Sequence, residues 1–386
     1  MGGNRPERGL VRAAALAVVM LAAEGAPGQA QAPPAVERTV TLPTGVELRY
    51  VEAGSPAAET VVFLHGYTDS NLSFRSTIEA LLERRPDLRI LALDLRGHGG
   101  SSMPPVAECA PEPWRCFRVE DFARDVLAFL EALDVDRTHV VGHSYGSMVA
   151  QDVALAAPDR IASIVLIGSA ARTVGNPAIE QFVLGQLIEG TWRPELEARG
   201  LAWPADVYQL TPIEIDPGAE EWLLANWVTE IAGDPDYLAE MASRTARLPL
   251  GAWLGVARAA LEFDNVARLA DLTVPTLVLW GSQDAVTAES DQVVLRAALD
   301  AAAKACRTTY VWKIYGQEPL PASGVAESDF GHNFQWGAGP EVAADIAAWL
   351  ETGAPSEDLT YVDPAAPGGK RTARGEADLI RGPDCS

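Results

Sequence analysis

Ser144 is the residue whose setting most clearly favours covalent chemistry. It stands in the segment Gly142-His-Ser-Tyr-Gly146, after the pair Val140-Val141 and before a stretch with helical spacing. A sharp turn from strand to helix lifts a serine hydroxyl above a sheet, and glycines on either side let neighbouring backbone pass close. The segment therefore predicts that Ser144 is a nucleophile.

A serine hydroxyl needs a base at neutral pH, and the chain offers five histidines. Four of them, His65, His98, His139 and His143, lie in the predicted strands or in the turns directly after them. Only His332, in the segment Phe330-Gly-His-Asn-Phe334, stands on a separate late loop. A lone late histidine is more often a surface residue, but in this setting elimination favours His332 as the general base.

An orienting carboxylate should hold the base, and Asp284 is the leading candidate. Asp94 is its strongest rival, but it precedes the serine, whereas the chain order Ser, Asp, His favours Asp284. A second place for the acid lies after residue 168, yet no carboxylate occurs between Gly168 and Glu180. Asp329 is close to the histidine in sequence and is expected to shape its loop.

The negative oxygen of an acyl-transfer intermediate should be held by backbone N–H groups. One is expected from Tyr145, after the nucleophile, and one from Tyr67, after the supporting pair His65-Gly66. Each such donor contributes on the order of 3 kcal/mol in the transition state. The tyrosine side chains could instead serve as plain pocket walls.

The elements that must position these groups alternate between strands and helices, which is typical of an α/β protein with a mostly parallel sheet. A hairpin is predicted first, and the later strands are continuous apolar runs of the kind buried on both faces of a sheet. The predicted strands are 38–42, 46–52, 60–64, 88–93, the run ahead of Ser144, 161–168, 274–280 and 308–315. The predicted helices are 74–83, 119–133, the stretch from 147, 290–305 and 340–351.

The alternation is interrupted over 171–265, which becomes helical, is broken by prolines and holds five of the ten tryptophans: Trp192, Trp203, Trp222, Trp227 and Trp253. We interpret it as a helical cap over the active site. The core then comprises 33–170 and 266–352, and the extension 353–386 is expected to be either pinned by a disulfide or disordered.

Residues 1–32 resemble a secretory signal peptide, with basic Arg5, Arg8 and Arg12, a short apolar stretch and a small-residue cleavage site. A disordered tail or an uncleaved anchor is the alternative. We expect a secreted or periplasmic protein without a membrane span, because no other stretch is apolar enough to cross a bilayer.

Charge and cysteines narrow the possible partners. The formal net charge of −23 would repel phosphate-rich partners, so nucleic acid is excluded as the default partner. In an oxidising compartment the four cysteines suggest the disulfides Cys109–Cys116 and Cys306–Cys385, against four unrelated thiols. Neither metal-ligand spacing nor a cofactor motif is present, so no metal and no cofactor are expected.

Taken together, the motifs resemble those of the α/β-hydrolase superfamily, in the branch of esterases, cofactor-free haloperoxidases and epoxide-hydrolase-like enzymes. They are His65-Gly66, Asp94-Leu-Arg-Gly-His-Gly99, Gly142-His-Ser-Tyr-Gly146, Gly281-Ser-Gln-Asp284 and Gly331-His332. The resemblance covers about 38–351 and implies an eight-stranded, mostly parallel sheet with helices on both faces and an inserted cap. Epoxide hydrolases of this branch carry Asp as nucleophile, whereas position 144 is Ser.

The sequence therefore predicts a secreted serine hydrolase that cleaves an ester or lactone, with an apolar group, through an acyl-enzyme on Ser144. An amidase or aminopeptidase, a perhydrolase and a carbon–carbon bond hydrolase would use the same groups. A hydrolase-fold binding protein without useful turnover is the alternative outside enzymes.

Overall fold

The computed structural model describes residues 35–109, 112–228, 230, 233–316, 330–362, 370–373, 377 and 379–383. The predicted signal peptide, Asp329 and Cys385 lie outside the described residues, so the predicted leader and the pair Cys306–Cys385 stay predictions. Cys109 and Cys116 are joined by a disulfide, as predicted.

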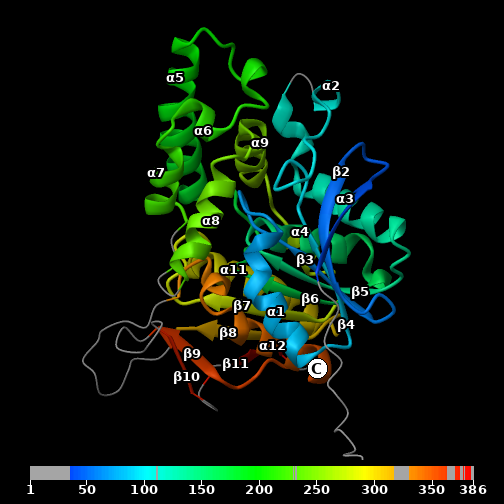
Figure 1. Ribbon diagram of the computed structural model, residues 1–386. Coiled ribbons are helices and arrows are strands. Elements are labelled where there is room, and N and C mark those ends of the chain that lie inside the picture. The colour runs from blue at the N-terminus through cyan, green and yellow to red at the C-terminus, as the bar shows by residue number, and fades with distance from the viewer. Residues whose placement is uncertain are drawn as a thin grey trace, which may run out of the picture. The chain divides into compact units, whose positions relative to one another are not determined.

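A twisted, mostly parallel sheet carries the fold (Figure 1), which confirms the predicted class. Its strands are β1 (Val36–Thr41), β2 (Glu47–Gly54), β3 (Glu59–Leu64), β4 (Leu88–Leu93), β5 (Thr138–His143), β6 (Ile161–Ile167), β7 (Thr276–Gly281), β8 (Tyr310–Tyr315) and β11 (Leu379–Arg381). They lie in the order β1-β2-β4-β3-β5-β6-β7-β8-β11. Only β1, β2 and β11 run antiparallel to their neighbours.

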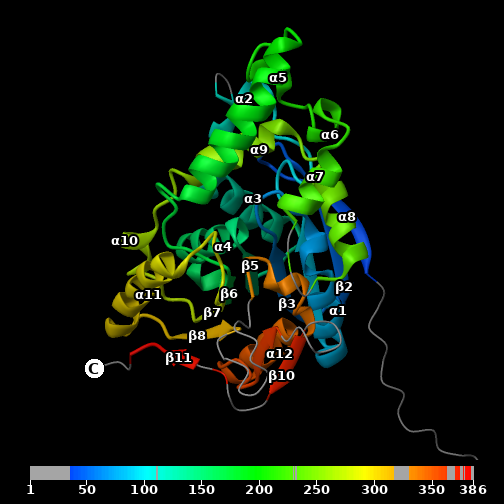
Figure 2. The ribbon, with the colours of Figure 1, turned by 90° about the vertical axis from the view of Figure 1, so that its left-hand side faces the viewer.

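Helices cover both faces of the sheet, because successive strand side chains point to opposite faces and both sets are apolar. Val62 and Leu64 of β3 face one core, and Val61 and Phe63 face the other. The first face is covered by α3 (Val119–Ala132), α4 (Tyr145–Ala156), α10 (Val266–Leu269) and α11 (Glu289–Lys304). The second is covered by α1 (Arg75–Arg84) and α12 (Gly339–Thr352), which pack on one another (Figure 2).

The segment between β6 and β7 leaves the sheet as a set of helices. They are η4 (Ala178–Trp192), α5 (Arg193–Ala198), η5 (Ala205–Val207), α6 (Pro212–Ile215), α7 (Ala219–Asn226), α8 (Pro235–Thr245) and α9 (Leu250–Ala260). Its two ends pair with one another, since the Thr173 N–H donates to the Phe263 carbonyl and the Asn265 N–H to the Ala171 carbonyl. We refer to 171–265 as the cap.

Ordinary end signals set the bounds of individual helices. Asp234 caps α8 by accepting from the Tyr237 N–H at 3.0 Å, and Pro235 occupies the first turn. Helix α12 ends at Gly353, whose φ of 73° is a conformation that glycine adopts without a steric penalty. The short helices are η1 (Asn71–Phe74), α2 (Val106–Cys109), η2 (Pro113–Cys116), η3 (Pro158–Arg160) and η6 (Phe334–Trp336).

Two expectations about the C-terminal part need correction. The described sheet has nine strands rather than eight, because β11 pairs with the free edge of β8. The extension is not disordered where it is described: β9 (Leu359–Val362) pairs with β10 (Lys370–Ala373), and the Ser356 hydroxyl donates to Asp345 at 2.6 Å. Backbone pairing and this buried carboxylate hold residues that show no periodicity of their own.

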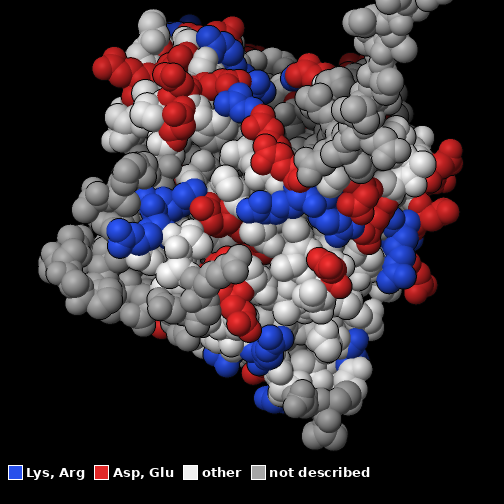
Figure 3. All heavy atoms as spheres, turned by 60° about the horizontal axis from the view of Figure 1, so that its bottom comes forward, with Lys and Arg blue, Asp and Glu red and all other residues white. Residues whose placement is uncertain are grey.

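The described helices include none that is both long and apolar enough to cross a bilayer. The face shown in Figure 3 carries basic as well as acidic side chains. The overall acidic excess is therefore not spread as a uniform negative surface over that face.

Candidate active site

The nucleophile turn follows β5 and opens α4. Ser144 has φ 50° and ψ −121°, an uncommon conformation that the surrounding backbone holds in place. A Cβ on Gly142 would lie 2.4 Å from the Gly146 carbonyl oxygen, and one on Gly146 would lie 2.2 Å from that of Leu64. Both glycines are therefore required by close backbone approach, which explains their spacing around the serine.

Ser144, His332 and Asp284 are brought together at the carboxyl ends of β5, β8 and β7. The Ser144 Oγ lies 2.7 Å from His332 Nε2, and His332 Nδ1 lies 2.8 Å from Asp284 Oδ2. An ionised carboxylate only accepts hydrogen bonds, so Nδ1 carries the proton and Nε2 is free to accept the serine proton. The arrangement can remove a proton from Ser144 and stabilise the charge that results.

Asp284 is fixed by its own loop. Its Oδ1 accepts from the backbone N–H groups of Val286 and Thr287, and its Oδ2 accepts from the Thr287 hydroxyl at 2.6 Å. Burial alone would raise the pKa of Asp284, but the adjacent His332 and these hydrogen bonds hold it below its ordinary value. The carboxylate therefore stays ionised and oriented towards His332.

The His332 loop is supported by two close contacts. A Cβ on Gly281, at the end of β7, would lie 2.4 Å from the Phe330 carbonyl oxygen, and one on Gly168, at the end of β6, would lie 3.2 Å from the His332 ring. The loop thus packs onto glycine at both neighbouring strand ends. The carboxylate sits after β7, on the side that the sequence favoured over the end of β6.

Asp94, the rival acid, lies elsewhere and has a structural role. It is fully buried, accepts from the Asn71 backbone and side chain at 2.7 Å and from the Gly100 N–H at 2.8 Å, and holds two loops together.

The other histidines are tied into the fold. His65 donates through Nδ1 to the Gly66 carbonyl and accepts the Leu95 N–H on Nε2, which joins the loops after β3 and β4. Burial lowers the pKa of His65, so it remains neutral. Burial also lowers the pKa of His98 to about 3, and that of His139, which bonds to Ser163 and Glu59.

His143 and Asp69 form part of the site that sequence analysis missed. His143 Nε2 donates to the His332 carbonyl at 3.0 Å, and its Nδ1 lies 3.6 Å from Asp69 Oδ2. The position of His143 inside the nucleophile turn was visible in the sequence, but no spacing signal linked it to the late loop or to Asp69.

The backbone N–H groups of Tyr67 and Tyr145 donate to no acceptor in the described part of the chain. The Tyr145 N–H is also the first of α4, where the helix dipole favours a negative charge. A Cβ on Gly66 would approach the Ser144 Cβ to 3.0 Å, so glycine lets this loop lie against the nucleophile.

The two tyrosine side chains anchor the site outward. The Tyr67 hydroxyl donates to the Trp253 carbonyl in the cap, and that of Tyr145 donates to the Phe117 carbonyl, each at 2.6 Å. Burial raises the pKa of both phenols well above the ordinary value, so they remain neutral donors.

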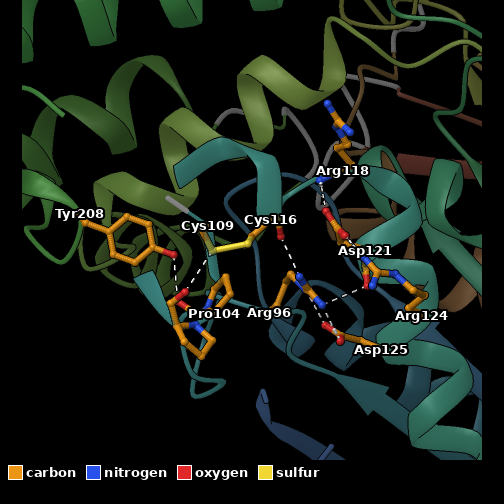
Figure 4. The surroundings of a disulfide bond; sticks show 10 residues. Arg96, Pro104, Cys109, Cys116, Arg118, Asp121, Arg124, Asp125 and Tyr208 are labelled. Atoms are coloured by element: carbon orange, nitrogen blue, oxygen red, sulfur yellow. Dashed lines mark hydrogen bonds and ion pairs between the residues drawn. A yellow bond between two sulfur atoms is a disulfide. The ribbon is translucent and has the colours of Figure 1, made fainter. Parts of the chain in front are cut away.

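Phe117 follows the disulfide loop shown in Figure 4. Arg96 pairs with Asp125 at 2.6 Å and donates to the Cys116 carbonyl at 2.8 Å, while the cap residue Tyr208 donates to the Pro104 carbonyl. The loop therefore links the cap to the nucleophile turn through Tyr145.

A cavity of about 320 Å³ opens at Ser144 and His332. Phe182 and Trp227 of the cap line one part of it, and Asp69 and Asn333 of the core line another. No group of three or more His, Cys, Asp or Glu side chains suited to a metal ion occurs within the described ranges.

Comparison with known proteins agrees with this geometry. A family model described as the alpha/beta hydrolase fold matches residues 59–337. Epoxide hydrolase A of Mycobacterium tuberculosis is 33% identical over 32% of this chain and 35% of its own length. A 2-hydroxy-6-oxononadienedioate/2-hydroxy-6-oxononatrienedioate hydrolase of Paraburkholderia xenovorans is 28% identical over 62% of this chain and 75% of its own.

Among solved structures, an esterase (EaEST) from Exiguobacterium antarcticum superposes with a TM-score of 0.59 at 16% identity. The match covers 82% of this chain and all of that one, and it shows the shared fold. Three relatives found by sequence are matched over 35%, 40% and 21% of their own lengths, so this chain spans less than half of each.

Proposed function

Since this chain belongs to the alpha/beta hydrolase family, we propose that it is a serine hydrolase that cleaves a carboxylic ester or lactone through an acyl-enzyme on Ser144. The proposal is supported chiefly by the continuous hydrogen-bond path from Ser144 through His332 to Asp284, with distances of 2.7 and 2.8 Å. His332 would act as base and then acid, and Asp284 would hold the imidazole.

In the first half-reaction the Ser144 Oγ attacks the substrate carbonyl carbon and its proton passes to His332 Nε2. The new oxyanion would accept hydrogen bonds from the N–H groups of Tyr67 and Tyr145. The bond to the alcohol oxygen then breaks, and His332 returns the proton to that oxygen.

In the second half-reaction water, deprotonated by His332, attacks the acyl carbon. The acid leaves, and Ser144 Oγ regains its proton from His332. No atom beyond substrate and water is consumed.

The identity of residue 144 favours ester chemistry over epoxide opening. A serine that opened an epoxide would form an ether, which water does not readily cleave, whereas a serine that attacks an ester forms an ester that water can hydrolyse. The apolar cap side chains that line the cavity, among them Phe182 and Trp227, support an apolar group in the substrate.

A fluorophosphonate probe tests the nucleophile. Wild type and Ser243→Ala, a matched serine change on cap helix α8, should both be labelled, and Ser144→Ala should not. Equal labelling of the Ser144→Ala protein would remove Ser144 from the mechanism.

A substrate panel tests the reaction class. We expect p-nitrophenyl esters or lactones to be hydrolysed faster than amino-acid arylamides, carbamates and epoxides. A clear preference for arylamides would replace the ester assignment by an amidase or aminopeptidase.

We also propose export by residues 1–32. Cell fractionation of the full chain should place the protein outside the cytoplasm, and deletion of these residues should retain it inside. Equal distribution of the two forms would contradict export.

A further inference from the structure

Two cavities meet at Ser144, and they differ in size and lining. Besides the larger cavity, a second one of about 50 Å³ lies on the other side of the serine. The two share Tyr67, Ser144, Ile179 and Val286 as a common boundary. A substrate carbonyl seated on Ser144 can therefore extend one substituent into each.

The position of His332 decides which substituent goes where. In the proposed function, His332 must give its proton to the alcohol oxygen, so the alcohol has to lie on the side of the imidazole. His332 lines only the larger cavity, whereas Tyr145, the proposed oxyanion donor, lines only the smaller one. The alcohol therefore belongs in the larger cavity and the acyl chain in the smaller.

The smaller cavity limits the acyl chain by volume. A water-sized group needs about 10–15 Å³, so about 50 Å³ accommodates roughly three to five methyl- or methylene-sized groups. Its far wall is formed by Met148 of α4 and by Val256, Ala257 and Ala260 of α9. Each of these four residues is almost fully buried.

The lining also excludes charged acyl groups, since no Lys, Arg, Asp or Glu side chain borders the smaller cavity. The polar side chains that do border it are engaged within the protein. Thr173 donates to the Ala260 carbonyl, Asn176 donates to the Val286 carbonyl, and the Thr287 hydroxyl donates to Asp284. A charged group placed there would lose its hydration without a partner.

We propose that the enzyme selects esters of short, uncharged acyl groups, from acetyl to about butyryl, carried on bulkier alcohols, and that the α4–α9 wall sets the acyl limit. The inference rests on the proposed function. It deepens it by assigning the two sides of the scissile bond to two cavities.

The test measures kcat/KM for p-nitrophenyl acetate, butyrate and octanoate. For wild type we expect octanoate to be at least about tenfold poorer than butyrate, because a few methylenes without space already cost about that much. Ala257→Leu adds an isopropyl group to the smaller cavity and should lower butyrate relative to acetate by about 10- to 100-fold. Met148→Ala should raise octanoate relative to butyrate by about tenfold.

Ala178→Leu is the matched control, because Ala178 borders only the larger cavity. It should lower the rates for esters of bulky alcohols and leave the ratio of butyrate to acetate within about twofold of wild type. Thermal melting identifies any variant that fails to fold, and Met148→Ala supplies an independent measurement if Ala257→Leu does.

The outcomes separate the two proposals. If Ser144 is labelled but octanoate is the preferred ester, or if Ala178→Leu changes the acyl ratio and Ala257→Leu does not, the cavity assignment is overturned and the proposed function stands. If no ester is hydrolysed and Ser144 is not labelled, the proposed function itself is overturned.

Discussion

The core and the cap contribute to the site in different ways. In the core, backbone contacts at Gly142, Gly146 and Gly281 leave no room for a side chain and fix where Ser144 and His332 stand. In the cap, side chains such as Trp227 and Ala257 bound the space around the serine without touching the proton path. The difference teaches that main-chain geometry sets the chemistry here, whereas side-chain volume sets which substrate fits.

The largest expected effect therefore belongs to the core. Asp284→Asn should lower kcat by about 10⁴-fold, because an amide can donate to His332 Nδ1 and favour the wrong tautomer. Steady-state kinetics with a short-chain ester measures the loss. Asp291→Asn, on nearby helix α11, is the control and should stay within a few-fold of wild type; a loss of less than tenfold for Asp284→Asn would break the distinction between core and cap.

Next comes the loop that joins the two regions. Arg96→Met would leave the Asp125 carboxylate buried without its guanidinium partner and should cost about 3–5 kcal/mol of unfolding free energy. Urea unfolding measures the change. The exposed pair Arg193–Glu197 on cap helix α5 provides the control, since Arg193→Met should cost less than about 1 kcal/mol. Equal costs for the two variants would contradict the structural role of the loop.

Acid should destabilise the core in particular, since the cap contains no histidine. Burial lowers the folded-state pKa of His98 to about 3, whereas its unfolded pKa is near 6.5. Below pH 6.5 the unfolded chain binds a proton that the folded chain does not, so this contribution is complete above pH 6.5 and is lost as pH falls towards 3.

From pH 7 to pH 5 the loss due to His98 is about 2 kcal/mol. His98→Asn should reduce the fall in unfolding free energy over that interval by a similar amount, whatever its effect at pH 7. Urea titrations at both pH values measure it, and an unchanged pH dependence in the variant would show that His98 does not titrate in this way.

The smallest effect is expected at the surface of the cap. Trp222 is 37% exposed and stacks on Phe182 at a centroid distance of 6.4 Å. Trp222→Ala should change the unfolding free energy by about 0.5 kcal/mol. A loss above about 2 kcal/mol in thermal or urea unfolding would mean that the outer cap is more tightly coupled to the core than the contacts indicate.

The strands and motifs could be predicted because their signals are local. Continuous apolar runs marked β3 and β4, and the glycines around Ser144 marked the turn. By contrast, β11 could not be predicted, since Leu379, Ile380 and Arg381 form a strand only by pairing with the edge of β8.

The candidate site divides in the same manner. The order Ser144, Asp284, His332 could be extracted from the chain, because each residue follows a recognisable strand. The contact between His143 and the His332 loop spans 189 residues, and the smaller cavity depends on α9 packing beside α4. Neither leaves a pattern in sequence, because both arise from tertiary packing.

The most direct measurement of the central claim is to quench the enzyme with acid during turnover of a p-nitrophenyl ester and to map the attached acyl group by peptide mass spectrometry. We predict one acyl group on Ser144, formed in a burst with the release of p-nitrophenol and absent from Ser144→Ala. An acyl group on another residue, or continued turnover by Ser144→Ala, would contradict the account.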